Sequence, residues 1–245
     1  MRTKAAATRA LPQALITGVL AAHAGTAAAT TSSVFGPGVD AGERAIEYRL
    51  SYAAEEESFD QRLHYQQALR PDLRARLIAA QRRRGAGDLE LAYWRVETQW
   101  QYLRGSGSGW AAAVRGEVQI AEGDDGPHRL RIGWTGSRAL SARWQQRVNL
   151  LAGREIGGGR ASGIAIELRA QTTYTVSDGG RLGLELFSDL NTTTDLGGFD
   201  DQEHQLGPIF KQKIGERWAV STSVLVGVSD AAPDLAWRLL VERSL

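Results

Sequence analysis

The chain has 245 residues, with 29 Lys and Arg, 28 Asp and Glu, no Cys and a formal net charge of +1. The lack of cysteine excludes disulfides, thiol chemistry and cysteine-based zinc sites. Beyond residue 29, no stretch approaches the ~18 consecutive apolar residues of a spanning helix. Only a β-barrel could cross a bilayer with so weak an apolar signal, because its lipid-facing and lumen-facing residues alternate.

Residues 1–29 predict a removed signal peptide. A basic start precedes an apolar run over residues 10–22, and Ala27 and Ala29 have the A-x-A spacing of a cleavage site. We therefore expect export through the general secretory route, the alternative being a short buried helix or anchor. Loss of the three basic leader residues would leave the chain near −2, which removes support for a nucleic-acid partner.

Residues 30–42 contain Gly, Ser and Pro and are expected to be an N-terminal periplasmic lead-in. From residue 43 to residue 245 the sequence alternates with the period of a β-strand; Ile46 and Tyr48, for example, share the face opposite Glu47 and Arg49. The alternating segments are ERAIEYRLSY, FDQRLHYQQAL, DLRARLIAAQR, LAYWRVETQWQYL, GWAAAVRGEVQIA, HRLRIGWTG, LSARWQQRVNLLA, ASGIAIELRAQTTYTV, RLGLELFSDL, EHQLGPIFKQK, ERWAVSTSVLVGV and LAWRLLVERSL. They predict an all-β, transmembrane, antiparallel up-and-down β-barrel of about 12 strands.

Short connections alternate with longer ones along this part of the chain. The short connections are RPD, RGSGS, GSR, SDGG and KIGE, and they are rich in turn-forming residues. Short periplasmic turns and longer outer loops are typical of outer-membrane barrels, which would place both termini in the periplasm. A soluble sandwich or lipocalin-like barrel is the alternative.

The fourth strand carries an irregularity. Leu89 and Leu91 have the opposite parity from Trp94, Val96 and Trp100. A β-bulge, or a different start for this strand, would account for the change of face.

Aromatic residues near the ends of the predicted strands indicate interfacial girdles. The predicted girdle consists of Tyr52, Trp94, Trp100, Tyr102, Trp110, Trp134, Tyr174, Trp218 and Trp237.

Three segments suggest a family: GPGVDAGERAIEYRLSY, EHQLGPIFKQK and SDAAPDLAWRLLVERSL. The chain resembles a group of largely uncharacterised Gram-negative outer-membrane β-barrel proteins that consist of a signal peptide and a small antiparallel barrel. The resemblance implies a final strand that closes the barrel and is recognised by the barrel-assembly machinery. It also implies contact with outer-membrane lipid and lipopolysaccharide. The chain departs from the usual pattern by ending in Leu245 rather than an aromatic residue.

The faces opposite the apolar ones would line the lumen. The predicted lining comprises Arg49, Arg62, His64, Arg74, Arg76, Arg95, Glu97, Arg115, Glu117, Arg129, Arg131, Arg143, Arg147, Glu167, Arg169, Glu185, Arg238 and Glu242. With Lys211, Glu47, Asp189 and Glu203 on the same faces, thirteen cations stand against eight anions. This excess predicts a narrow passive pore for small, preferentially anionic solutes. A closed structural barrel with a salt-bridged lumen and a soluble ligand-binding β-protein are the alternatives.

An enzymatic function is not expected, and neither is a cofactor or a metal. His64, His128 and His204 lack the Ser two positions later that outer-membrane barrel hydrolases pair with their catalytic His. The acidic loops AEGDDGP and DLGGFDDQE could offer oxygen ligands, but they lack the spacing of an EF-hand and are expected to be solvated.

Overall fold

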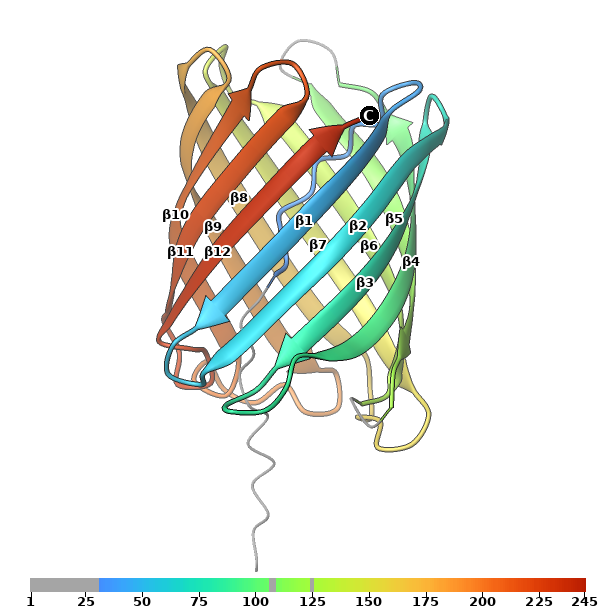
Figure 1. Cartoon of the computed structure of the whole chain (residues 1–245), viewed down its shortest axis with the longest axis vertical. Coiled ribbons are helices and arrows are strands. Elements are labelled where there is room, and N and C mark those ends of the chain that lie inside the picture. The colour runs from blue at the N-terminus through green and yellow to red at the C-terminus, as the bar shows by residue number, and fades with distance from the viewer. Residues whose placement is uncertain (1–30, 106–108, 124–125) are drawn as a thin grey trace, which may run out of the picture.

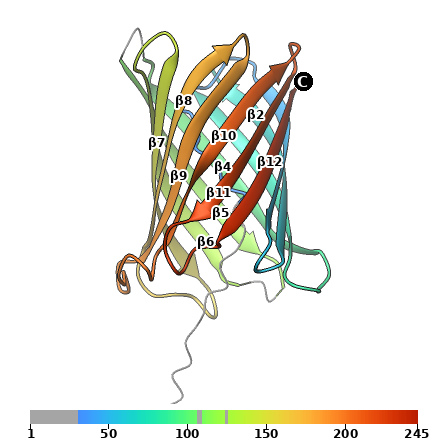
Figure 2. The ribbon, with the colours of Figure 1, turned by 90° about the vertical axis from the view of Figure 1, so that its left-hand side faces the viewer.

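Twelve antiparallel strands close into one barrel, as the alternation predicts (Figures 1 and 2). The structure is a computed structural model, and it describes residues 31–105, 109–123 and 126–245. The strands are β1 (Arg44–Ala53), β2 (Ser58–Arg70), β3 (Leu73–Arg83), β4 (Glu90–Leu103), β5 (Trp110–Ala121), β6 (His128–Ala139), β7 (Trp144–Ile156), β8 (Ala165–Ser177), β9 (Gly180–Thr192), β10 (Glu203–Ile214), β11 (Trp218–Gly227) and β12 (Leu235–Ser244). None of the described residues forms a helix able to cross a membrane. The predicted signal peptide, residues 1–29, lies outside the described residues.

The first and last strands meet edge to edge and close the barrel. β1 pairs antiparallel with β12 from Ala45 opposite Ser244 to Ala53 opposite Ala236. The amide of Leu245 donates to the carbonyl of Arg44 at 2.9 Å, so the pairing runs to the last residue. The final strand therefore has a hydrogen-bonded neighbour on each side, and the sheet has no open edge.

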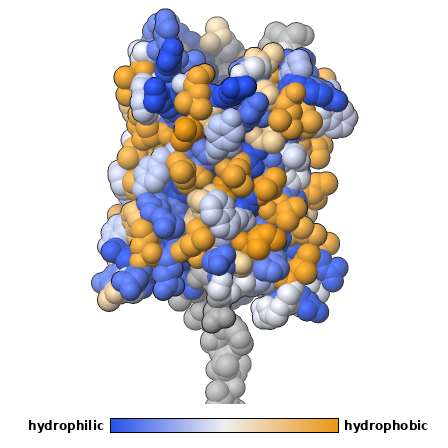
Figure 3. Space-filling model, turned by 45° about the vertical axis from the view of Figure 1, so that its right-hand side comes forward, coloured by the Kyte–Doolittle hydropathy of each residue, from blue (hydrophilic) through white to orange (hydrophobic). Residues whose placement is uncertain are grey.

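The two faces of the sheet differ as the period-two pattern requires. Leu63, Ile132 and Leu184 point outward and are more than half exposed. Arg49 and Glu185 point into the barrel and are buried. On the face that Figure 3 shows, apolar side chains are spread over the outer wall, and hydrophilic ones are most frequent near the two rims. Such a wall is suited to contact with lipid.

The two ends of the barrel differ in their connections. The short-turn end holds the turns at residues 71–72, 140–143, 178–179 and 215–217, the described residues 104–105 and 109, and the C-terminus. The long-loop end holds residues 54–57, 84–89, 157–164, 193–202 and 228–234 and the described residues 122–123 and 126–127. One predicted turn was misplaced: GSR at 136–138 belongs to β6, and the chain turns at 140–143 instead. Ser141 makes this turn, since its hydroxyl accepts hydrogen bonds from the amides of Arg143 and Trp144.

The irregularity predicted in the fourth strand is a β-bulge. Ala80 pairs with Tyr93 while the next residue, Gln81, pairs with Leu91, so Ala92 is the extra residue of β4. Ala92 and Tyr93 are both buried although they are consecutive. Because of this extra residue, the alternation of inward and outward side chains shifts by one position. Trp94 therefore lies on the outer face.

Residues 31–40 run through the interior of the barrel, and we call them the lumen segment (Figure 1). The sequence suggested a periplasmic lead-in here; the structure places these residues inside the barrel. Thr31, Val34 and Val39 are almost completely buried within the ring of strands. The segment leads toward the short-turn end, where β1 begins.

Candidate functional site: the barrel lumen

The lumen segment belongs to no strand, so its backbone groups need other partners. They find them in polar side chains of the wall. Asn149 in β7 accepts from the Phe35 amide at 2.8 Å and donates to the Phe35 carbonyl at 3.0 Å. Thr135 in β6 donates to the same carbonyl at 2.8 Å. Two fixed side chains thus hold one residue of the segment through both of its backbone groups.

Further contacts continue along the segment in both directions. Toward the short-turn end, Gln99 in β4 donates to the carbonyls of Gly36 and Pro37, and the Val39 amide donates to Gln101 at 3.0 Å. Toward the other end, three arginines donate to three consecutive carbonyls. These pairs are Arg49 with Thr31, Arg238 with Ser32 and Arg169 with Ser33. Six strands therefore hold the segment in place.

The ring of Phe35 lies among three guanidinium groups. The Cζ atom of Arg115 is 3.7 Å from the ring centroid, and those of Arg49 and Arg76 are both 5.1 Å away. Cations are attracted to the face of an aromatic ring, and more strongly where water is excluded. The single aromatic side chain of the lumen segment is thus held by three arginines of the wall.

Two carboxylates in the middle of the wall join several arginines into a network. Glu97 in β4 pairs with Arg76 at 3.0 Å, Arg95 at 3.5 Å and Arg115 at 2.8 Å. Glu117 in β5 pairs with Arg95 and Arg115 and also with Arg131, at 3.3, 2.9 and 2.9 Å. Because each of the two carboxylates has three arginine partners, the network ties β3, β4, β5 and β6 together on their inner face.

Other ion pairs extend this arrangement around the barrel. Glu167 in β8 binds both Arg131 and Arg169. Glu185 in β9 binds Arg238 in β12, which spans two intervening strands across the interior. These ion pairs join residues of the predicted lining, for which the sequence left open a pore wall or a salt-bridged core. They neutralise much of the charge of that lining.

Besides the exposed Lys213, four cations in the lumen nevertheless lack an ion pair with any described carboxylate: Arg62, Arg147, Arg181 and Lys211. Arg62 lies over the ring of Tyr93, 5.6 Å from its centroid. The other three bond to neutral glutamines. The described wall therefore keeps basic groups that are not neutralised.

Two cavities remain beside the lumen segment. One, of about 430 Å³, lies toward the short-turn end and includes Arg147, Arg181, Lys211 and Glu242 in its lining. The other, of about 230 Å³, includes Arg62, Arg129, Asp189 and Glu203. Ser32 lines the smaller cavity and six other residues of the segment, among them Phe35 and Gly36, line the larger one, so the segment separates and narrows the free space.

The structure places all but one of the predicted lining residues on the inner face. Arg143 is the exception, because it lies in the turn that was misplaced; it is exposed and donates to the Tyr174 hydroxyl at 2.9 Å. That bond raises the pKa of Arg143. His64 is inside and buried, but neither ring nitrogen has a hydrogen-bond partner among the described residues.

Several lumen residues were not predicted because only charged side chains were selected. Asn149, Thr135, Gln99 and Gln101 hold the lumen segment and are neutral. Each has the inward parity of a charged neighbour on its own strand; Asn149, for example, comes two residues after Arg147. Extending each inward face to its polar residues would have found them. Arg181, at the beginning of β9, is charged but was also left out; it shares the inward parity of Glu185, so the same extension would have found it.

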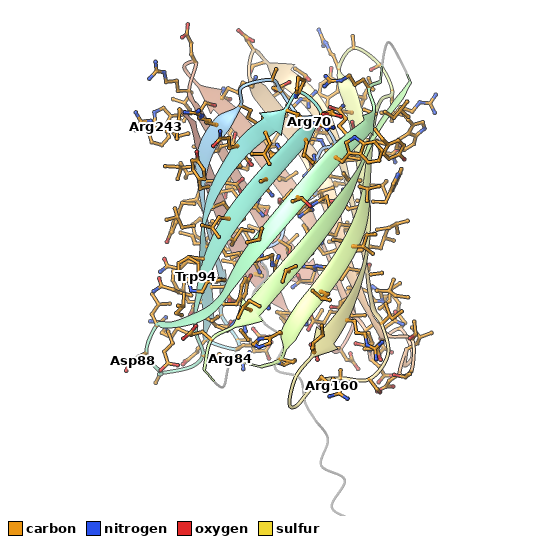
Figure 4. All side chains as sticks on the ribbon, turned by 90° about the vertical axis from the view of Figure 1, so that its right-hand side faces the viewer. Arg70, Arg84, Asp88, Trp94, Arg160 and Arg243 are labelled. Carbon is orange, nitrogen blue, oxygen red and sulfur yellow. The ribbon has the colours of Figure 1, made fainter. Side chains whose placement is uncertain are left out.

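The predicted girdle residues lie on the outer wall near the strand ends. Figure 4 shows Trp94 on the outer wall toward the long-loop end, with Arg84 and Asp88 at the rim beyond it. At the short-turn end, the Trp134 indole donates to the Tyr102 hydroxyl at 3.0 Å, and the Trp100 indole donates to Asp72 at 3.2 Å.

The hydrogen bonds that Asp72 accepts from Arg70 and Trp100 lower the pKa of this turn carboxyl. Trp144, which packs against Tyr174 with ring centroids 5.0 Å apart, was missed because its strand was expected to begin earlier.

The described residues contain no cluster of three or more His, Asp or Glu placed to hold a metal ion, and Asp124 and Asp125 lie outside them.

A closed antiparallel barrel with an apolar outer wall and a charged interior is the fold of Gram-negative outer-membrane β-barrel proteins. Solved structures agree. The COG4313 outer membrane channel from Pseudomonas putida F1 matches with a TM-score of 0.65 at 10% identity, covering 88% of this chain and 100% of that one.

The KdgM porin in complex with disordered oligogalacturonate matches with a TM-score of 0.60 at 12% identity, over 82% of this chain and 99% of that one. The NanC porin matches with a TM-score of 0.60 at 9% identity, over 82% and 100%. At such identities the likeness concerns the fold. No protein-family model matches the chain, and no curated protein matches it in sequence.

Proposed function

We propose that this protein is a narrow passive pore of the outer membrane for small, preferentially anionic solutes, with the lumen segment as its constriction. One observation carries the proposal: Arg62, Arg147, Arg181 and Lys211 line the free space of the lumen and have no carboxylate partner among the described residues. A low-dielectric wall focuses such a field along the channel and raises the local concentration of anions.

The lumen segment sets the width of the proposed passage. It lies between the two cavities, and its Phe35 ring is held by three arginines. A solute would have to pass beside the segment, or pass after the segment has moved out of the lumen. Barrels of twelve strands stand between those of ~8 strands, which side chains fill, and the larger porins with open channels.

Planar-bilayer recording of the refolded chain from residue 30 onward tests the proposal. Under a KCl gradient we expect steady openings and a reversal potential displaced toward that of chloride. Arg62→Glu should shift the reversal potential toward that of potassium, because Arg62 lines a cavity and its replacement breaks no ion pair. Arg143→Glu, the same change in an exposed turn, is the control and should leave the reversal potential unchanged.

A closed structural barrel is the second candidate, and the dense network around Glu97 and Glu117 favours it. Silence in the bilayer from protein that is folded and inserted would reject the pore and support this candidate. A soluble ligand-binding protein is less compatible with the outer wall, since Leu63, Ile132 and Leu184 would then face water.

The remaining expectations stay predictions: a non-enzymatic function, periplasmic termini, and contacts with lipopolysaccharide and the assembly machinery. Of the described ends, Leu245 lies at the short-turn end and Ser32 toward the long-loop end, so only the C-terminus fits the expected side.

A further inference from the structure

Three basic side chains gather on one side of the larger cavity, and each comes from a different strand. Arg147 is in β7, Arg181 in β9 and Lys211 in β10. Arg181 and Lys211 are direct partners in the antiparallel register of β9 and β10. Like charges placed together repel unless an anion lies between them.

The two arginines converge on a single neutral oxygen. Gln145 Oε1 lies 2.5 Å from Nη1 of Arg181 and 3.4 Å from Nη2 of Arg147. Lys211 likewise donates to Gln171 Oε1, at 2.9 Å. Neutral amides thus occupy positions where buried guanidinium and ammonium groups usually meet carboxylates. Moreover, Nε of Arg147 is buried and has no hydrogen-bond partner in the described structure.

The rest of the cavity supplies space and leaves the positive excess in place. Its volume is about 430 Å³, and seven basic side chains line it against four carboxylates. Two of those carboxylates, Glu43 and Glu47, already pair with Arg74 and Arg49. The cavity also reaches the lumen segment, because a Cβ placed on Gly36 would lie 3.3 Å from Cζ of Arg147.

We propose that Arg147, Arg181 and Lys211 form a binding site for a small organic dianion with two carboxylate groups. The paired guanidinium groups offer the fork geometry that grips one carboxylate, and the ammonium group offers a point charge for the second. This proposal rests on the proposed function, which supplies the ligand class of small anions. It adds the position in the lumen at which such an anion binds.

Calorimetric titration of the detergent-refolded chain from residue 30 onward tests the site, with succinate as the probe. At low salt, succinate should bind more tightly than acetate, which has one carboxylate, and more tightly than inorganic phosphate. In Arg147→Gln/Arg181→Gln its affinity should fall by at least about tenfold, a loss of about 1.4 kcal/mol. Arg143→Gln, outside the lumen, should bind succinate like the unchanged protein.

Three results would overturn the assignment: no succinate binding, equal affinity in the double variant, or tighter binding of phosphate than of succinate. Because neither arginine has an ion pair, the double variant should fold, and heat-modifiable mobility on unboiled gels checks that it does. Succinate binding by a barrel that does not conduct would keep the site and reject the pore. Anion-selective conduction without succinate binding would keep the pore and reject the site.

Discussion

The guanidinium of Arg115 lies directly against the ring of Phe35, with 3.7 Å between Cζ and the ring centroid. The two residues are on different parts of the chain, one in the wall and one in the lumen segment, so the contact fixes the segment across the barrel. Arg115 also pairs with Glu97 and Glu117. The ring is therefore attached to the most connected part of the charge network.

Removing that ring should loosen the constriction. Phe35→Ala deletes the contacts with Arg115, Arg49 and Arg76 and leaves the backbone bonds to Asn149 in place. We expect larger single-channel conductance in planar bilayers, because the volume of the ring becomes available to ions. Phe199→Ala removes an exposed loop phenylalanine and should leave the conductance unchanged. Equal conductance of Phe35→Ala and the unchanged protein would contradict a constriction at Phe35.

The position of the lumen segment can be tested independently of conduction. The chain contains no cysteine, so a single Val34→Cys gives an unambiguous label site. Val34 is 2% exposed, packed with Ala53, Phe187 and Leu225. We expect slow reaction with a membrane-impermeant maleimide in folded protein and fast reaction after denaturation. Asp88→Cys, on an exposed loop, should react fast in both states. Rapid labelling of folded Val34→Cys would show that the segment lies elsewhere.

The charge network should make a measurable contribution to stability. Glu97→Gln removes one carboxylate from three buried arginines, and breaking a buried ion pair in this way costs about 3–5 kcal/mol. Glu155→Gln is the matched control: its pair with Arg129 is partly exposed and is worth at most about 1 kcal/mol. Urea unfolding in lipid vesicles measures the loss of stability in each variant. Equal midpoints for the two variants would mean that the network adds nothing to the fold.

Gly207 has a steric role in the sheet. A Cβ at this position would lie 1.8 Å from the carbonyl oxygen of Val224, at the place where the β10–β11 register skips residues. Gly207→Ala should therefore displace the neighbouring strand and destabilise the barrel by about 1–3 kcal/mol, as overpacking does. Gly158→Ala, with nothing within 4 Å of the new atom, should unfold like the unchanged protein. Urea titration of both variants decides the point.

The barrel and its two faces could be predicted from the sequence because each strand encodes its own orientation. Alternation with period two is local, so Arg49, Glu97 and Arg131 could be placed inside without knowledge of the partners. The bulge at Ala92 was visible for the same reason, as a change of parity within one strand. Arg143 was misplaced because Gly136 and Ser137 resemble a turn, although the chain turns later at Ser141.

The lumen segment could not be predicted in this way. The Phe35 backbone bonds to Asn149, 114 residues away, and the Ser32 carbonyl accepts from Arg238, 206 residues away. Such contacts depend on the closed barrel, and no periodicity within residues 31–40 indicates them. The sequence offers one hint, since residues 31–39 carry no charge and contain a single aromatic side chain among small ones. This composition fits a strip of backbone inside a wall of arginines.

The seam between β1 and β12 also constrains how the molecule is assembled. The lumen segment is joined through residues 41–43 to β1, which is one side of that seam. Sealing the seam around the segment encloses it in the same event that completes the barrel. The Glu185 and Arg238 side chains join across the interior, and Arg238 also holds the Ser32 carbonyl. We therefore expect residues 31–40 to reach the interior no later than the pairing of β12 with β1.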